Sequence, residues 1–490
     1  MKKWGGLDDS PVTYALSIDL MKTSLLLLLW TPLAWNCTPP ETGLGPGEGT
    51  DSVQVWISSS DQANLLRAQT LPFAEKAAAT SQTIQVDTST VYQTMDGFGY
   101  TLTGGSARLI MQMDARARAA LLEELFGKGA PSVGISYLRL SIGASDLDPF
   151  VFSYNDLGPG ESDVELKTFS LGPDTLYLIP LLREIRAIAP GIALMGSPWS
   201  PPLWMKDNKS SKGGQLLPAY YPVYARYFVR YLQAMQGLGL EVGAVTIQNE
   251  PQHGGNNPSM LMSASQQADF IKNHLGPAVR AAGLSTKIII WDHNCDHPEY
   301  PIAILNDPEA RRFIDGSAFH LYAGEAQAMS QVHDAHPDKN LYFTEQWTGA
   351  KGDFGGDLKW HVRNVIIGTA RNWSRVVLEW NLANDPDYKP HTPGGCTECK
   401  GALTIEGSTF RRNVSYYIIA HAARFVPPGS RRIASNQWAE VPNVAFQTPD
   451  GKKVLIALND GVKPASFKVE SGSRHFVATL NPGNVGTFVW

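Results

Sequence analysis

Two patterns of apolar and polar residues alternate between residues 96 and 424. Short apolar runs, typical of buried strands, occur at residues 97–101, 137–142, 193–198, 242–247, 287–291, 317–322, 340–344 and 376–380. Between them, apolar residues recur every three or four positions, as on one face of a helix. Examples are residues 107–126, 177–188, 220–235, 267–282 and 358–372. Eight alternating strands and helices predict an α/β fold of the (β/α)8 barrel type.

The chain on either side of this region has a different pattern. Strand-like runs lie at residues 53–57, 83–91, 444–447, 454–458, 466–469, 475–480 and 485–490. Turn residues such as Pro449-Asp450-Gly451 separate them. We therefore predict a β-sandwich side domain made from both chain termini, residues 53–94 plus 425–490, beside a barrel at residues 95–424.

The first residues predict export. The apolar run at 25–30 is too short for a membrane span and has the length of a signal peptide's apolar region. Cys37 and the Pro/Gly-rich tether at 38–52 resemble a bacterial lipoprotein, although residues 34–36 fit the usual lipidation sequence poorly. We expect residues 1–37 to form the export segment of a secreted, periplasmic or outer-membrane protein, with Cys37 as a candidate lipid anchor. A plain cleaved signal is the alternative.

Composition narrows the function further. A formal net charge of -5, with 43% hydrophobic residues, is that of an ordinary globular protein without a basic surface for nucleic acid. Cys396 and Cys399 form a single CxxC pair, whereas a structural zinc site needs a second pair. In an exported protein this favours a small-loop disulfide, and reduced thiols are the alternative.

Seven of the eight predicted strands end near polar or aromatic residues. Along the chain these are Arg139, Asp146, Trp199, Asn249, Glu250, Asp292, His293, His320, Tyr322, Glu345, Trp380 and Asn381. The active site of such a barrel lies at the carboxyl ends of its strands. A polar residue at one strand end can be explained by a local hydrogen bond, but polar or aromatic residues at seven strand ends predict a functional site.

Two of these residues suggest the chemistry. Glu250 and Glu345 follow the fourth and seventh strands, which lie opposite each other across the barrel mouth. Acetal hydrolysis uses such a pair: carboxyl groups about 5 Å apart retain the anomeric configuration, and a separation of about 6.5–9.5 Å inverts it. A glutamate base with a metal would need carboxylate ligands on successive strand ends, which the fourth to sixth strands lack. We therefore expect no metal or organic cofactor.

The chain resembles glycoside hydrolase family 30, the glucosylceramidase and endo-β-1,6-glucanase family, from about residue 92 to the end. The resemblance rests on MDGFGYTLTGGSA (95–107), RLSIGASD (139–146), GSPWSPPLWMK (196–206), TIQNEP (246–251), FTEQWTG (343–349) and EWNLANDP (379–386). It implies a retaining enzyme with Glu250 as general acid/base and Glu345 as nucleophile. The substrate-binding residues that it implies are Asp146, Trp199, Asn249, His320, Tyr322, Trp380 and Asn381.

The chemistry of these roles leads to further expectations. Glu250 must be protonated in the free enzyme, so we expect a raised pKa. We expect Arg139 to fix a carboxylate, Trp204 to be either a loop anchor or a sugar platform, and residues 390–405 to border the aglycone side.

The GGCTEC loop looks more like bacterial members and β-1,6-glucanases than the lysosomal lipid-cleaving enzymes. β-1,6-Glucan is therefore the first choice of substrate. Glucosylceramide, simple β-glucosides and β-xylosides are alternatives, as is transglycosylation by the same residues. A surface protein that binds carbohydrate without cleaving it is the alternative from another class, although such proteins usually lack one of the two carboxylates.

Overall fold

The computed structural model describes residues 52–74 and 82–490. The predictions for the export segment, for Cys37 and for all but the last residue of the tether lie outside the described residues. Within these residues, no helix combines the length and apolarity needed to cross a membrane.

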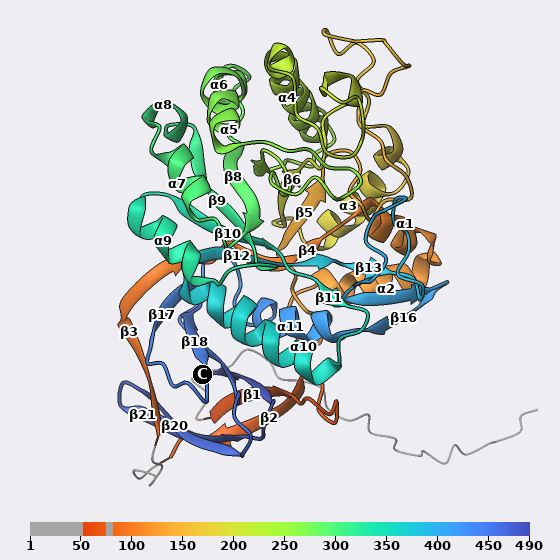
Figure 1. Cartoon of the computed structure of the whole chain (residues 1–490). Helices are drawn as coiled ribbons and strands as arrows, with labels where there is room; N and C mark the ends of the chain where they lie inside the picture. Colours follow the sequence, from red (N-terminus) through yellow and green to blue (C-terminus); the bar gives the residue numbers. More distant parts are fainter. Residues whose placement is uncertain (1–51, 75–81) are drawn as a thin grey trace, which may run out of the picture. The chain divides into compact units, whose positions relative to one another are not determined.

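Eight parallel strands close into a barrel, as predicted (Figure 1). They are β4 (Gly97–Thr101), β5 (Tyr137–Ser141), β6 (Ala193–Ser197), β7 (Ala244–Thr246), β8 (Lys287–Asn294), β9 (Ile314–His320), β10 (Asn340–Glu345) and β12 (Ser374–Asn381). Each coincides with one of the eight apolar runs. The strands follow one another in chain order around the barrel, with β12 pairing with both β10 and β4.

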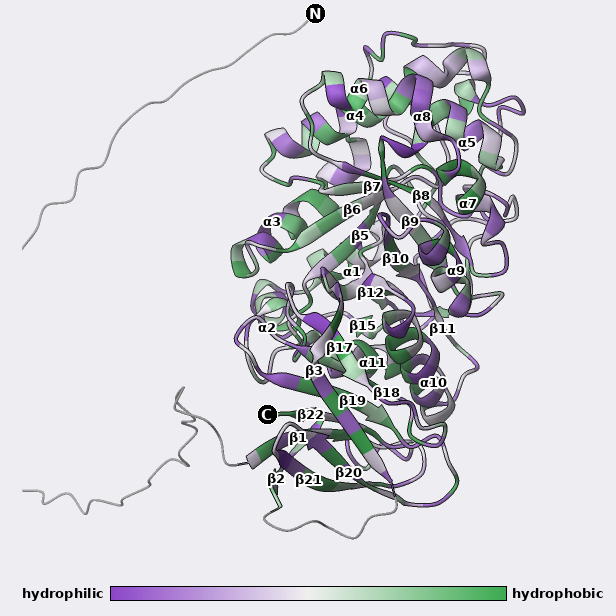
Figure 2. Cartoon of the chain, turned by 90° about the vertical axis from the view of Figure 1, so that its left-hand side faces the viewer, coloured by the Kyte–Doolittle hydropathy of each residue, from purple (hydrophilic) through white to green (hydrophobic). Residues whose placement is uncertain are grey.

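Burial on both faces explains why these strands read as continuous apolar runs. Inside the barrel, Tyr137, Met195, Ile289 and Leu378 belong to one buried cluster. The outer faces pack against the surrounding helices in a larger cluster. In Figure 2 the strands β5 and β6 are coloured mainly hydrophobic, and polar residues concentrate on the outer helices.

Helices cover the outside of the barrel. They are α1 (Gly104–Gln112), α2 (Ala115–Phe126), α3 (Leu178–Ile188), α4 (Tyr221–Gly237), α5 (Ala264–Phe270), α6 (Gly276–Ala281), α7 (Glu299–Leu305), α8 (Pro308–Arg311), α9 (Gln327–Ala335), α10 (Phe354–His361) and α11 (Val414–Ala423). The helical segment expected at 107–126 is two helices. Asp114 separates them because its carboxylate accepts hydrogen bonds from the first N–H groups of α2 and so caps it.

Two other predicted helices contain π-helical turns. The segment η4 (Ile271–Leu275) joins α5 to α6, and η5 (Val362–Thr369) continues α10. One extra residue per turn shifts the apolar face, so the regular spacing in the sequence did not indicate these irregularities.

The remaining large sheet has nine strands in the order β2-β1-β22-β19-β18-β17-β3-β20-β21. Their bounds are β1 (Ser52–Ser58), β2 (Arg67–Pro72), β3 (Thr83–Thr94), β17 (Arg431–Ser435), β18 (Asn443–Gln447), β19 (Lys453–Leu458), β20 (Ala465–Ser471), β21 (Arg474–Leu480) and β22 (Val485–Val489). It folds into a β-sandwich around a core that includes Val55, Leu455, Phe467, Phe476 and Phe488. Strands from both ends of the described chain therefore share this sheet, and β2 and β17 were not expected.

Short strands lie after the last two barrel strands. Strand β11 (Thr348–Gly349) pairs with β14 (Cys399–Lys400). Strand β13 (Ala383–Asn384) pairs with β15 (Leu403–Glu406), which pairs with β16 (Thr409–Arg412). These pairings fold the segment after β12 back toward the barrel mouth.

Candidate active site

The carboxyl ends of the barrel strands surround a cavity of about 320 Å³. Its lining includes six of the residues expected at the site: Asp146, Trp199, Glu250, Tyr322, Glu345 and Trp380. Asn249, His320 and Asn381 are buried but lie outside the lining. Asn249 accepts a hydrogen bond from Arg139, and His320 contacts the lining residue Glu250. The Asn381 amide donates to the carbonyl of Ala383.

Glu345, the last residue of β10, is held at both carboxylate oxygens. Its Oε2 accepts a hydrogen bond from Arg139 Nη1 at 2.5 Å, and its Oε1 accepts one from the Tyr322 hydroxyl at 2.9 Å. A carboxylate fixed by two donors keeps one orientation, as a nucleophile must. The side chain is 7% exposed, so the contact is also largely free of water.

Glu250 follows β7 and faces Glu345. His320 Nδ1 lies 3.2 Å from Glu250 Oε1 and 3.8 Å from Glu345 Oε1. One carboxylate oxygen of each glutamate and one nitrogen of His320 lie within 4.8 Å of one another. The two carboxylates are thus close enough for a sugar carbon to be attacked by one while the other serves its leaving oxygen.

A buried charge network lies beneath this pair. Arg139 is completely buried and contacts Glu345, Asp292 and Asn249. Asp292 also accepts hydrogen bonds from the hydroxyls of Thr246 and Thr344, both at 2.7 Å. Burial would raise the pKa of Asp292, but the Arg139 guanidinium outweighs it and, together with the His320 imidazole, holds that pKa well below its usual range. The network therefore stays charged and fixes the residues above it.

The backbone is irregular at the places that carry these side chains. Glu250, Trp291 and Asp292 have φ angles of 48°, 72° and 64°, a region that non-glycine residues rarely adopt. The strand register shifts near Asp292 in β8 and near the end of β10. Such bulges turn side chains toward functional sites, and strained residues persist there only when their surroundings hold them. Here the N–H of Glu250 donates to the carbonyl of Asp292 at 3.0 Å.

Aromatic rings form one wall of the cavity. The rings of Trp199 and Trp380 lie 5.5 Å apart, and the Arg139 guanidinium lies 4.7 Å from the Trp199 ring. Cys399 packs in the same apolar cluster, and Trp347 packs against it. Indole faces suit the C–H face of a sugar ring, whereas the carboxylates opposite suit its hydroxyl groups.

Glu250, His320 and Glu345 have the spacing of a metal site, but their hydrogen bonds favour proton chemistry. Burial would lower the pKa of His320, yet the carboxylates of Glu345, Asp292 and Glu250 raise it to about 9. At neutral pH both ring nitrogens therefore carry protons, and each faces a carboxylate. An imidazolium has no lone pair to offer a cation.

The sequence matches the glycosyl hydrolase family 30 TIM-barrel domain over residues 95–426 and the family's beta sandwich domain over residues 429–488. The chain belongs to glycosyl hydrolase family 30. The resemblance drawn from the sequence motifs is thereby confirmed, and the chain is a glycosyl hydrolase.

Individual family 30 proteins are similar over most of the chain. The endo-1,6-beta-D-glucanase of Neurospora crassa is 34% identical over 431 residues, which cover 83% of this chain and 88% of the relative. The solved structure of the endo-beta1,6-glucanase BT3312 superimposes with a TM-score of 0.84 and 36% identity, covering 90% and 99% of the two chains. The mouse lysosomal acid glucosylceramidase is 27% identical over 430 residues, 81% of each chain.

The pKa values of the two glutamates in this family 30 site are shifted in opposite directions, and the shift of Glu250 differs from the sequence prediction. Burial would raise the pKa of Glu250, but the hydrogen bond and charge of His320 outweigh it, so the pKa lies below its ordinary value. Burial raises the pKa of Glu345, and the Glu250 and Asp292 carboxylates add to this against His320 and Arg139. The prediction of a raised pKa for Glu250 is therefore wrong for the free site, because the sequence did not indicate the contact with His320.

Other expectations for the site can be compared with the structure. Arg139 fixes a carboxylate, as expected. Trp204 is a loop anchor: its Nε1 donates to the carbonyl of Asn155 at 3.0 Å, and its ring packs against Tyr220. Cys396 and Cys399 form the expected disulfide, and both line the cavity.

Several lining residues were not selected from the sequence as substrate contacts. They are His253, Asn256, Asn294 and Trp347. His253 and Asn256 lie beyond the end of β7, and no spacing rule indicates that this segment reaches the cavity. Asn294 is the last residue of β8, so its place at a strand end was an available signal. Trp347 follows Glu345 by two residues, so its place at a strand end was the available signal. His293, which was considered, lines the cavity, and its buried Nδ1 has no hydrogen-bond partner among the described residues.

Proposed function

We propose that this glycosyl hydrolase is an endo-β-1,6-glucanase that retains the anomeric configuration. The observation that carries the mechanism is the closeness of the two carboxylates: oxygens of Glu250 and Glu345 lie within 4.8 Å. Retaining enzymes hold their carboxyl groups about 5–5.5 Å apart, whereas inverting enzymes leave room for a water molecule at about 6.5–9.5 Å. The β-1,6-glucanase names of similar proteins support the substrate.

In the first step, Glu345 attacks the anomeric carbon and the bond to the leaving oxygen breaks. Glu250 donates its proton to that oxygen, so the shortened glucan leaves as an alcohol. Positive charge that develops at the anomeric carbon stabilises the ionised form of Glu345. In the free site Glu250 is the more acidic of the two, so the one proton that the pair shares must move from Glu345 to Glu250 before the bond breaks. The developing positive charge favours this form, in which Glu250 is the proton donor.

In the second step, water hydrolyses the glycosyl ester. Formation of that ester has removed the charge of Glu345, and Glu250, now ionised, takes a proton from the water that attacks the anomeric carbon. Glu345 leaves as a carboxylate, and Arg139 and Tyr322 again donate hydrogen bonds to it. Two displacements at the same carbon retain its configuration.

The cavity favours a sugar over a lipid on the leaving-group side. His253, Asn256 and Asn294 contribute polar groups to the lining, and the Asn256 amide lies 3.4 Å from Glu250 Oε2. Because Glu250 protonates the leaving oxygen, groups beside it face the leaving unit. Amides and imidazoles pair with hydroxyl groups, whereas the chains of a ceramide would leave them without hydrogen-bond partners.

Product analysis tests the proposal. β-1,6-Glucan, glucosylceramide and an aryl β-glucoside are each incubated with the enzyme and with the Glu345→Gln variant. Loss of the Glu345 carboxylate should lower kcat at least about a hundredfold. We expect oligosaccharides from β-1,6-glucan, with the β-anomer formed first in proton NMR spectra. Glucose release from glucosylceramide without glucan cleavage would reject the substrate assignment, and an α-anomer formed first would reject the retaining mechanism.

Glu250→Gln is the matched control for the two roles. An aryl glucoside with an acidic phenol needs no proton donor, so this variant should release a burst of phenol and then stall at the glycosyl ester. Binding of glucan without any product, in enzyme with both glutamates intact, would instead support the non-catalytic alternative.

We also propose that the enzyme is exported, with residues 1–37 as its targeting segment. The apolar run at 25–30 and the tether after Cys37 support this. Fractionation of cells that express the full chain, with Cys37→Ser as comparison, tests export and lipid attachment separately.

A further inference from the structure

The segment after β12 returns to the cavity as a loop closed by a disulfide. We call residues 392–400 the disulfide loop; Cys396 and Cys399 are bonded within it and both line the cavity. Cys399 is buried beside Trp199 and Trp380 in one apolar cluster. The bonded sulfur atoms are therefore part of the wall against which a sugar ring would lie.

The disulfide loop is attached to Asp146 at two points. The backbone N–H of Cys396 donates to Asp146 Oδ2 at 3.2 Å, and the N–H of Thr392 donates to the carbonyl of Asp146 at 2.9 Å. Gly395 lies so close that a Cβ atom there would be 2.3 Å from the Asp146 carbonyl oxygen. Asp146 is 5% exposed, so a donor that leaves its carboxylate is not replaced freely by bulk water.

The other end of the loop is attached to β11, the short strand that follows the nucleophile-bearing strand β10. Cys399 lies in β14, which pairs with β11, three residues beyond Glu345. The N–H of Ala350 also donates to the carbonyl of Glu398 at 2.8 Å. The disulfide therefore connects the residue that donates to Asp146 with the residue that is fixed to β11.

We propose that the Cys396–Cys399 disulfide is a positioning element of the sugar pocket. It holds the Cys396 N–H against the Asp146 carboxylate, and Asp146 then binds hydroxyl groups of the glucosyl unit beside Glu345. This inference rests on the proposed function insofar as Asp146 is taken to bind sugar. Loss of the disulfide should weaken sugar binding and leave the reacting carboxylates as they are, because Arg139, Tyr322 and His320 hold those carboxylates independently of the loop.

The test compares the oxidised enzyme, the enzyme reduced with dithiothreitol, and the double variant C396S/C399S. Reduction transfers two electrons and two protons from the dithiol to the disulfide, giving two cysteine thiols and the oxidised reagent. Thiol titration verifies this in folded protein. KM and kcat are measured with an aryl β-glucoside and with β-1,6-glucan, and the Kd of a glucose-configured iminosugar is measured by calorimetry.

We expect KM and Kd to rise about tenfold, as for the loss of one hydrogen bond to a buried charge, with kcat changing less than about twofold. Reoxidation should restore both values, and dithiothreitol should not affect C396S/C399S. The matched control is Glu398→Gln, which breaks the exposed Lys351–Glu398 ion pair in the same loop and keeps the disulfide. Its KM should be unchanged, since such surface pairs contribute little.

A double-mutant cycle with Asp146→Asn distinguishes positioning from general loosening. If the disulfide acts through Asp146, its removal should have little further effect on Kd in the Asp146→Asn enzyme. Unchanged Kd in reduced folded wild type, a fall in kcat alone, or additive effects in the cycle would each overturn the inference. An effect on iminosugar binding without any cleavage of β-1,6-glucan would support the inference and reject the proposed substrate instead.

Discussion

At the scale of single residues, one imidazolium controls two carboxylates. His320 has no solvent exposure, and its nitrogens face Glu250, Glu345 and Asp292. The ionised forms of both glutamates are stabilised by the same charge, and Asp292 contacts the other nitrogen of the His320 ring. A change in His320 should therefore be visible in the whole pH profile and not only in the rate.

We predict that His320→Asn moves both limbs of the kcat/KM profile to higher pH. The kcat/KM profile reports the free enzyme, in which Glu250 is the more acidic of the two, so the acid limb follows the pKa of Glu250 and the alkaline limb follows that of Glu345. Removal of a positive charge at this distance raises both pKa values, by about one unit or more. The measurement is kcat/KM of an aryl β-glucoside across the pH range in which the enzyme is folded.

Tyr322→Phe is the control for this prediction. The Tyr322 hydroxyl donates to Glu345 and is uncharged, so its loss should raise the pKa of Glu345 alone and move only the alkaline limb. An acid limb that does not move in His320→Asn would show that the imidazolium does not set the pKa of Glu250.

At the scale of elements, strands were predicted better than helix ends. Each barrel strand is buried on both faces and leaves a distinct apolar run, whereas β2 has the sequence RAQTLP with little burial and no alternation. Candidate site residues at strand ends could be found because barrel topology requires chemistry there. Their hydrogen bonds could not be predicted, because Arg139, Asp292 and His320 lie on three different strands and come into contact only when the barrel closes.

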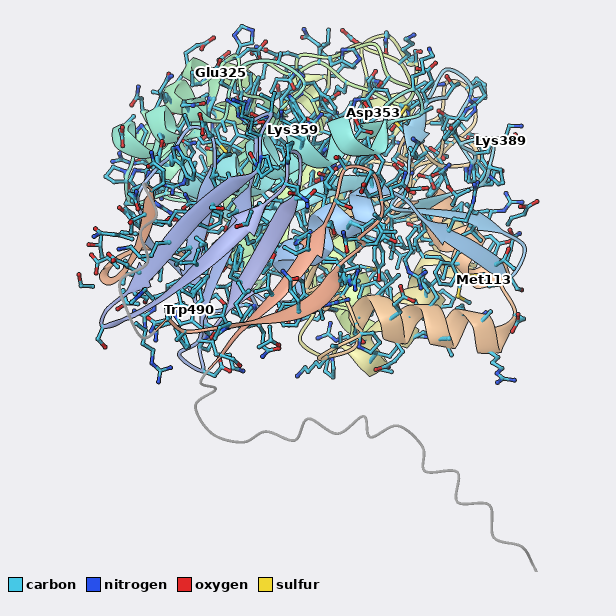
Figure 3. All side chains as sticks on the ribbon, turned by 90° about the horizontal axis from the view of Figure 1, so that it is seen from below. Met113, Glu325, Asp353, Lys359, Lys389 and Trp490 are labelled. Atoms are coloured by element: carbon cyan, nitrogen blue, oxygen red, sulfur yellow. A yellow bond between two sulfur atoms is a disulfide. The ribbon has the colours of Figure 1, made fainter. Side chains whose placement is uncertain are left out.

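Helix α10 shows how a start was missed. The sequence pattern placed its first residue at 358, but the helix begins at Phe354, since Asp353 caps it and accepts a hydrogen bond from the Gly356 N–H at 2.8 Å. Two glycines in the first turn have low helix propensity and hid this start. Figure 3 labels Asp353 at this end of the helix and Lys359 further along it.

We predict that Asp353→Ala lowers the free energy of unfolding by about 1 kcal/mol, because the first turn loses its cap. Asp353→Asn keeps an acceptor and should retain most of that stability. Urea unfolding of the three proteins measures this. An equal fall in Asp353→Ala and Asp353→Asn would mean that the carboxylate charge, and not the cap, is what matters. Activity should change little, since Asp353 lies at the start of α10, whereas the helix contacts Glu379 of β12 through His361 at its other end.

At the scale of the whole molecule, α11 joins the barrel to the sandwich. All ten of its residues are buried. His421 in this helix contacts Thr487 of β22 at 2.9 Å and Ser58 of β1 at 2.8 Å. Beside it, the rings of Phe425 and Trp56 lie 4.4 Å apart. Strands from the two ends of the described chain thus both hydrogen-bond to one buried imidazole of this helix.

This imidazole should make the fold sensitive to acid. Burial, with a contribution from Arg424, lowers the pKa of His421 to about 3. In the unfolded chain its pKa is about 6.5, so below that pH the unfolded state binds a proton that the folded state does not bind. Stability from this group is complete above about pH 6.5 and falls by about 1.4 kcal/mol per pH unit until the folded pKa is reached.

We predict that His421→Gln, which can hydrogen-bond but cannot titrate in this range, loses about 2 kcal/mol less than wild type between about pH 7 and about pH 5. The measurement is the free energy of urea unfolding of both proteins at the two pH values. Other titrating groups, including His293 and His320, are the same in both proteins and cancel in the difference. Equal falls in the free energy of unfolding would mean that His421 accepts a proton in the folded state. The contact between α11 and the sandwich would then not be the acid-sensitive part of the molecule.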